Sequence, residues 1–234
     1  MKKIGLIGGM SWESSALYYR LLNERVRDRL GGLHSASCVM GSVDFAEIER
    51  MQSGGEWEAA GDLLAAEARS LQHAGAEVIV LCTNTMHKVA GRIEQAIDIP
   101  FLHLVDVTAE AIVAAGLSQV LLLGTRFTME ESFYRDRMEA HGVRVVIPDA
   151  GDRATVNRVI YEELVLGEVG DGSRREFREI IAKGIATGAE GVILGCTEIE
   201  LLIGHDDVPI PVFASTSLHA AAAVDFALAS SRSE

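Results

Sequence analysis

The sequence predicts an α/β fold made of two similar halves, each with a mostly parallel sheet. Short runs of Val, Ile and Leu alternate with longer amphipathic stretches along the 234 residues, which is the pattern of βα units. In addition, residues 74–83 are echoed by residues 187–197, about half a chain later. A repeat of this length indicates a duplicated domain rather than a solenoid, whose repeats are roughly 20 to 50 residues long.

The apolar runs predict eight strands, enough for two small sheets. These strands are expected at Lys3–Gly8, Ala36–Val43, Glu77–Leu81, Phe101–Leu104, Gln119–Leu123, Val143–Ile147, Gly191–Leu194 and Pro211–Phe213. The amphipathic stretches between them predict helices at Ser14–Leu30, Glu56–His73, Met86–Ile97, Val107–Ala115, Met129–His141, Ala154–Leu166, Ser173–Thr187 and Ser217–Ser230.

Composition narrows the expected partners and location. The formal net charge of −13 would repel phosphate backbones and anionic lipids, so we expect neither nucleic acid nor a membrane as a partner. No apolar run is long enough to span a bilayer. Three cysteines, an odd number, argue against a disulfide framework and for a reducing, cytoplasmic location.

Cys82 and Cys196 each follow a strand of the internal echo, where a helix is expected to begin. Ligands of open α/β sheets bind at the carboxyl ends of the strands. A helix N-terminus there lowers the pKa of a thiol and binds carboxylates. A lone cysteine is more simply a small buried hydrophobe. Two cysteines at matching repeat positions favour a site, and we expect them to face each other across a cleft between the halves. Cys38, within a strand, is expected to be structural.

Two thiols on opposite walls of a cleft suit the inversion of a stereocentre. One thiolate removes the α-proton from one face, and the other thiol delivers a proton to the opposite face. The carbanion needs hydrogen-bond donors at the carboxylate of a small-molecule amino-acid substrate. The candidate substrate ligands are the neighbours of the two cysteines: Thr83, Asn84, Thr85, Thr197 and Glu198.

In each half, a glycine-containing turn follows the first predicted strand. Gly8-Gly9-Met10-Ser11 lacks the spacing of the dinucleotide fingerprint. Met10 and Ser11 are candidate substrate ligands, although tight strand-to-helix turning alone explains the glycines. Thr125 and Thr128, in the equivalent turn of the second half, are candidates by the same argument.

The sequence offers little to hold a cofactor. Pyridoxal phosphate needs a Schiff-base lysine. None of the four lysines lies at the carboxyl end of a predicted strand, and the seven histidines show no paired metal-ligand spacing on one helix face. We therefore expect no cofactor and no metal.

Four motifs are spread along the sequence: Gly-Gly-Met-Ser-Trp at 8–12, Cys-Thr-Asn-Thr at 82–85, Gly-Thr-Arg-Phe-Thr-Met at 124–129 and Gly-Cys-Thr-Glu at 195–198. In these motifs the chain resembles the aspartate/glutamate racemase family, and the resemblance covers essentially its whole length. The resemblance implies two pseudo-symmetric Rossmann-like domains, the second inserted into the first, with the active site in the cleft between them. Residues 1–98 with 210–234 would form the first domain and 99–209 the second. It also implies a homodimer, no cofactor, and Cys82 and Cys196 as the acid/base residues.

Details of the motifs bear on the substrate. Glu198 stands where cell-wall glutamate racemases usually have a histidine, and Leu166 stands where some aspartate-acting members have a basic residue. Residues 42–57 look closest to the broad-specificity amino-acid racemases, in which Arg50 or Gln52 would contact the substrate, although a solvated helix face is an equally good interpretation. We expect broad or aspartate/glutamate specificity. The alternatives are a cysteine-dependent isomerase or decarboxylase of a small dicarboxylate, and a non-catalytic amino-acid sensor.

Overall fold

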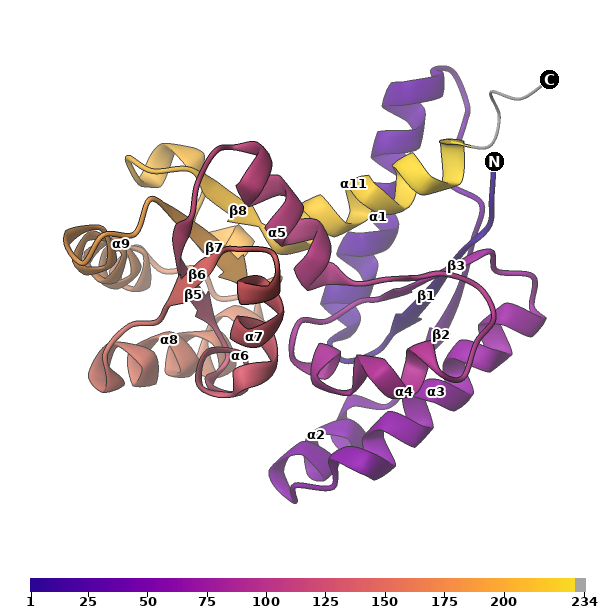
Figure 1. Cartoon of the computed structure of the whole chain (residues 1–234), viewed down its shortest axis with the longest axis horizontal. Coiled ribbons are helices and arrows are strands. Elements are labelled where there is room, and N and C mark those ends of the chain that lie inside the picture. Colours follow the sequence, from indigo (N-terminus) through magenta and orange to yellow (C-terminus); the bar gives the residue numbers. More distant parts are fainter. Residues whose placement is uncertain (230–234) are drawn as a thin grey trace. The chain divides into compact units, whose positions relative to one another are not determined.

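The computed structural model describes residues 1–229, and the chain divides into two compact units (Figure 1). Unit 1 comprises Met1–His103 and the C-terminal segment from His219 onward, and unit 2 comprises Leu104–Leu218. Each unit holds one four-stranded sheet in which every strand pair is parallel. The predicted α/β class, with two parallel sheets of the same design, is confirmed.

Unit 1 is built on a sheet of order β2-β1-β3-β4. The two central strands are short apolar runs that are buried throughout, as a strand covered by helices on both faces must be. The strands are β1 Ile4–Gly8, β2 Cys38–Ser42, β3 Val78–Leu81 and β4 Phe101–Leu102. The helices are α1 Trp12–Leu30, α2 Phe45–Ser53, α3 Trp57–His73, η1 Thr85–Val89, α4 Ala90–Glu94 and most of α11 Ser215–Leu228.

Unit 2 repeats this plan with the order β6-β5-β7-β8. Its strands are β5 Gln119–Gly124, β6 Arg144–Val146, β7 Gly191–Gly195 and β8 Val212–Ala214. Its helices are α5 Leu104–Ala114, α6 Arg126–Glu130, α7 Ser132–Ala140, α8 Ala150–Glu162, η2 Leu164–Leu166, α9 Asp171–Ala186, α10 Ile199–Leu202 and η3 His205–Asp207.

Each sheet separates two apolar layers. In unit 1 one face packs against α2 and α3 and the other against α1 and α11. In unit 2 one face packs against α8 and α9 and the other against α5 and α7. Successive side chains of a strand alternate between the faces, so the register of a strand decides which layer a residue at its end enters.

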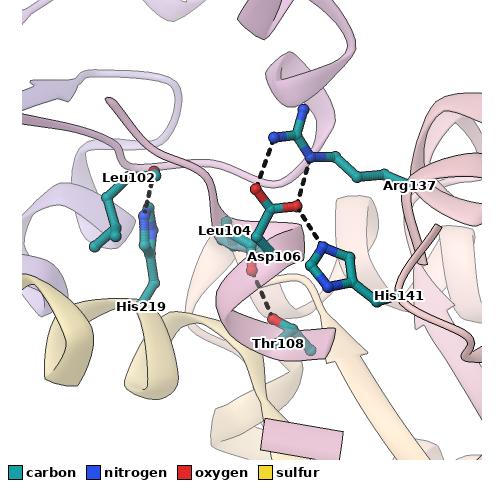
Figure 2. A network of polar contacts seen from close by, with 7 residues as sticks. All are labelled: Leu102, Leu104, Asp106, Thr108, Arg137, His141 and His219. Atoms are coloured by element: carbon teal, nitrogen blue, oxygen red, sulfur yellow. Dashed lines mark hydrogen bonds and ion pairs between the residues drawn. The ribbon is translucent and has the colours of Figure 1, made fainter. Parts of the chain in front are cut away.

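A polar contact outside these layers also ties α5 to α7 in unit 2 (Figure 2). The Arg137 guanidinium donates one hydrogen bond of 2.6 Å to each carboxylate oxygen of Asp106, and Nε2 of His141 lies 3.0 Å from Asp106 Oδ1. The bidentate geometry is the strong form of an arginine–carboxylate pair. These three partly buried side chains therefore fix α7 beside the first turn of α5.

Several predicted helices differ in detail. Predicted helix Met86–Ile97 is a 3₁₀ turn followed by the short α4, and predicted helix Met129–His141 is divided at Glu131, which is extended. Helices α2 and α10 were not among the predicted helices. Helix α11 begins at Ser215, two residues before its predicted start, and Ser230 of that prediction lies outside the described residues. Within residues 1–229, no helix combines the length and apolar character needed to cross a bilayer.

The unit boundaries fall later in the chain than 98/99 and 209/210. Strand β4 pairs with β3 in the first sheet, and β8 pairs with β7 in the second. Each unit thus completes its sheet with one short edge strand before the chain leaves it. The chain passes from unit 1 to unit 2 between His103 and Leu104 and returns between Leu218 and His219.

Candidate active site

The turn after β7 in unit 2 brings a thiol and a carboxylate together. Sγ of Cys196 donates a hydrogen bond of 2.9 Å to Oε2 of Glu198. Cys196 is partly buried against the α8 and α9 layer, and Glu198 is buried. Burial and the Glu198 carboxylate together raise the pKa of the Cys196 thiol well above its ordinary value. The resting thiol therefore keeps its proton and points it at a carboxylate.

The expectation that helix N-termini lower the pKa values of both thiols is wrong. Burial also raises the pKa of Cys82. The element after Cys82 is a five-residue 3₁₀ helix that starts only at Thr85, and α10 after Cys196 has four residues. Such short elements carry little aligned dipole, so the cost of placing a thiolate in the apolar interior dominates.

The strand registers show that the two cysteines do not occupy matching repeat positions. Ile7 pairs with Leu81 in unit 1, and Leu123 pairs with Leu194 in unit 2, which makes the two leucines equivalent. The next residue is Cys82 in unit 1 but Gly195 in unit 2, where it pairs with Gly124. Cys196 therefore corresponds to Thr83, and the expected match is wrong by one residue.

Because successive residues of a strand point to opposite faces, an offset of one residue places the two thiols on faces of their sheets that are not equivalent. Cys82 is fully buried in the layer between the first sheet and helices α1 and α11, among residues such as Tyr18 and Val224. Cys196 enters the layer equivalent to that of α2 and α3. Thr83, like Cys196, is partly buried. Cys82 is thus a core residue, and Thr83 holds the strand-end position that corresponds to Cys196.

Two predicted ligand segments of unit 1 lie at the carboxyl ends of the adjacent strands β1 and β3. Met10 and Ser11 are buried in the turn after β1, and Ser11 caps α1 by accepting from the Ser14 N–H at 3.1 Å. Gly9 has φ +93°, and a Cβ there would lie 2.1 Å from the Val43 carbonyl oxygen, so this turn needs glycine. After β3, Asn84 and Thr85 are buried beside the partly exposed Thr83.

Gln52 and Arg50 have different surroundings on α2. Nε2 of the buried Gln52 lies 2.9 Å from Sδ of Met86, one residue after Thr85. Arg50 instead pairs with Glu56 at 2.7 Å and more than half of its side chain is exposed. Leu166, on η2 of unit 2, is 69% exposed and supplies no group that would bind a carboxylate.

The predicted ligands of unit 2 gather around the Cys196 turn. Thr125 caps α6, its Oγ1 lies 3.2 Å from Thr128 Oγ1, and both side chains are buried. A Cβ on Gly195 would lie 3.4 Å from Thr128 Cγ2, so Thr128 sits next to the residue before Cys196. On the other side of the turn, Thr216 Oγ1 donates to Thr197 Oγ1 at 3.3 Å.

Sequence reasoning missed several buried or partly buried polar residues near these turns. Glu200 accepts from the Thr216 N–H at 3.0 Å and from Ser217 Oγ at 2.9 Å, and burial raises its pKa. In unit 1, His87 bonds the Thr83 carbonyl, close to two further histidines. None of these residues stands in a motif, and only the spacing of Glu200 two residues after Glu198 would have pointed to it. Among residues 1–229, no group of three or more His, Cys, Asp or Glu side chains is placed to hold a metal ion.

The chain is thus an α/β protein in which a thiol hydrogen-bonded to a carboxylate lies beside hydroxyl groups at the carboxyl end of a parallel strand. Such an arrangement can move a proton to or from a small carboxylate-bearing molecule. The model of the Asp/Glu/hydantoin racemase family matches residues 7–223, and the chain belongs to this family. Family membership supports amino-acid racemisation.

Relatives cover most of the chain. The broad specificity amino-acid racemase RacX of Bacillus subtilis (strain 168) is 26% identical over 162 residues, which are 69% of this chain and 70% of RacX. The crystal structure of a proposed Asp/Glu racemase from Yersinia pestis is 55% identical, with a TM-score of 0.92 over 97% of this chain and 100% of that one. An aspartate racemase homologue from Pyrococcus horikoshii OT3 is 36% identical, with a TM-score of 0.87 over 97% and 99% of the two chains.

Proposed function

We propose that this protein interconverts the enantiomers of a free amino acid without pyridoxal phosphate, with Cys196 and Glu198 as the proton-transferring pair. The observation that carries the proposal is the 2.9 Å contact between Cys196 Sγ and Glu198 Oε2. Family membership supports the reaction class. Aspartate and glutamate are the first substrates to test, because relatives are named for them, and a wider panel is needed because RacX is named as broad in specificity.

The pair supplies a base by moving one proton. The S–H bond of Cys196 breaks as its proton passes to Glu198, which leaves a thiolate. The thiolate then takes the α-proton of the substrate, so a C–H bond breaks and a new S–H bond forms. The electron pair spreads into the substrate carboxylate, where hydroxyl and backbone donors stabilise it. In unit 2 we assign this role to the hydroxyls of Thr125 and Thr197, and the fully buried Thr128 holds the Thr125 hydroxyl through a 3.2 Å contact.

Inversion also requires a proton donor for the opposite face of the carbanion. The sequence-based mechanism assigned that role to Cys82, whose side chain lies in the α1 and α11 core layer. We assign it to the hydroxyl of Thr83, the residue equivalent to Cys196. The O–H bond of Thr83 breaks as the new C–H bond forms; the Thr83 oxygen then takes a proton from water and Glu198 releases its proton to water, which restores the resting state. A hydroxyl is a weaker acid than a thiol, so it protonates the carbanion less readily. The enantiomer whose α-proton meets Cys196 should therefore exchange that proton with solvent faster than it racemises.

The proposed function is tested by deuterium wash-in, which is the replacement of the substrate α-proton by deuterium from heavy water. The purified protein is incubated in heavy water with L- and D-amino acids, and NMR follows the α-proton while chiral chromatography follows the enantiomeric ratio. We expect wash-in for at least one amino acid, and none with Cys196→Ser as the control. Absence of wash-in for every amino acid on the panel overturns the proposal, and calorimetric binding without wash-in would instead indicate an amino-acid sensor.

A second candidate function is the decarboxylation or isomerisation of a small dicarboxylate. Of the two thiols that follow a strand, Cys82 is fully buried and Cys196 is only partly buried, and one thiol suffices to protonate a carbanion after loss of CO₂. Including an arylmalonate and maleate in the same panel separates the candidates. Turnover of either compound, with no wash-in on amino acids, would favour the second function.

Two further expectations remain predictions from the sequence. They are assembly as a homodimer, which light scattering measures, and a cytoplasmic location.

A further inference from the structure

Three buried histidines gather behind the turn that carries Thr83, and the proposed chemistry uses none of them. His87, His103 and His219 are 3%, 5% and 0% exposed. The ring centroids of His87 and His103 are 4.7 Å apart, and those of His87 and His219 are 5.9 Å apart. All three belong to unit 1. A cluster of buried polar rings needs fixed hydrogen bonds, which define how each ring is held.

His219 is a fixed, neutral support for this cluster. Its Nε2 lies 2.8 Å from the Leu102 carbonyl oxygen (Figure 2), and its Nδ1 lies 2.9 Å from the Tyr18 hydroxyl. A carbonyl oxygen only accepts, so Nε2 carries the hydrogen and Nδ1 accepts from Tyr18. Burial lowers the pKa of His219 to about 4, which keeps the ring uncharged at neutral pH.

His87 connects the cluster to the Thr83 turn. Its Nδ1 lies 2.7 Å from the carbonyl oxygen of Thr83, so Nδ1 must donate. In a trans peptide the C=O of one residue and the N–H of the next point in opposite directions. The hydrogen bond from His87 to the Thr83 carbonyl therefore directs the Asn84 N–H to the side of the peptide away from the histidines.

We propose that His87 is a positioning residue that holds the Thr83–Asn84 peptide in the orientation in which Thr83 and the Asn84 N–H serve the substrate. This role rests on the proposed function of the Thr83 turn. The rings of His103 and His219 hold the His87 ring in place. His87 acts through the Thr83–Asn84 peptide and takes no part in the proton transfers.

The test compares two substitutions that differ in one donor. His87→Asn places an amide Nδ2 where the imidazole Nδ1 stood, whereas His87→Leu fills the space without a donor. We expect His87→Leu to lower kcat/KM on the order of tenfold, as expected for one lost hydrogen bond, and His87→Asn to recover most of that loss. His73→Leu is the matched control, because His73 Nδ1 makes the same kind of bond to the carbonyl four residues earlier, 2.8 Å from Arg69, at the surface of α3.

A second readout needs no activity. Amide hydrogen exchange at residues 83–85 should quicken in His87→Leu relative to wild type and to His73→Leu, and NMR of the wild-type imidazole should find the hydrogen on Nδ1. The positioning role fails if His87→Asn behaves like His87→Leu, if the 83–85 amides keep wild-type exchange in His87→Leu, or if the hydrogen is on Nε2 alone. If wild type shows no α-proton wash-in, the proposed function fails while these two measurements still decide the role of His87.

Discussion

Cys196 Sγ and Glu198 Oε2 lie 2.9 Å apart, with the thiol as donor, in the turn that ends β7. The contact has two opposing effects. The negative carboxylate opposes ionisation of the thiol and raises its pKa, yet the same oxygen is the nearest place to which the thiol proton can move. One residue thus makes the thiolate scarce at rest and available during turnover.

Glu198→Gln should separate these two effects. Removing the charge lowers the pKa of the Cys196 thiol, so alkylation of Cys196 at a fixed pH near neutrality should be faster than in wild type. Removing the proton acceptor should slow α-proton wash-in on the order of a hundredfold. Mass spectrometry of the Cys196 peptide measures the first effect, with the exposed Glu139→Gln as control. Unchanged alkylation would contradict the assigned cause of the pKa shift.

The two cysteines should respond differently to truncation. Cys82→Ala removes a fully packed sulfur from the α1 and α11 layer, so we expect the free energy of unfolding to fall by about 1 kcal/mol while wash-in stays near the wild-type rate. Cys196→Ala should abolish wash-in with little loss of stability. Denaturant unfolding and NMR measure both quantities. A folded Cys82→Ala protein without wash-in would restore the two-cysteine mechanism.

Substitution of Thr83 should change racemisation and wash-in unequally. Thr83→Val removes the proposed donor for the opposite face, so racemisation should fall on the order of a hundredfold while one enantiomer still takes up deuterium with retention of configuration. Thr83→Cys supplies a stronger acid and should raise the ratio of racemisation to wash-in. Equal losses of both rates in Thr83→Val would contradict the assignment.

His219 makes stability depend on pH. Its pKa is about 4 in the folded protein against an ordinary value of 6.5, so the unfolded chain binds the proton more readily. The stabilisation is complete above pH 6.5 and is lost as the pH falls toward 4, by about 3 kcal/mol. His219→Gln keeps a donor for the Leu102 carbonyl but does not titrate. Its free energy of unfolding should therefore rise relative to that of wild type as the pH falls from 6.5 toward 4. Unfolding titrations at several pH values check this, with the exposed His34→Gln expected to track wild type.

The sequence predicted the strands well because the central ones are uninterrupted apolar runs, such as Val78–Leu81, that only a sheet covered on both faces buries completely. It misplaced the match between the cysteines because residue identity suggested an alignment that only the strand pairing could test. The extra Gly195 shifts the second cysteine by one position and so to the other face. The thiol pKa values were misjudged because burial depends on the packing of distant helices.

Other misses arose where a local exception interrupts a pattern. Glu131 is extended between α6 and α7, although the amphipathic period continues through it. Helix α2 is only nine residues long and is started by the Asp44 side chain, which accepts from the Ala46 N–H, so its apolar pattern is too short to stand out. The buried histidines carry no sequence signal, because His87 and His103 meet through the packing of unit 1 and His219 joins them only through the return of α11 to that unit.

That return also sets an order of events during synthesis. Unit 2 is one uninterrupted stretch, Leu104–Leu218, and has all its strands as soon as it leaves the ribosome. Unit 1 has its four strands earlier but lacks α11, whose Ala220, Ala223 and Val224 complete the layer that buries Cys82. The half that is made first therefore keeps one apolar face without its α11 cover until α11 is synthesised, whereas the half that is made second needs no later segment.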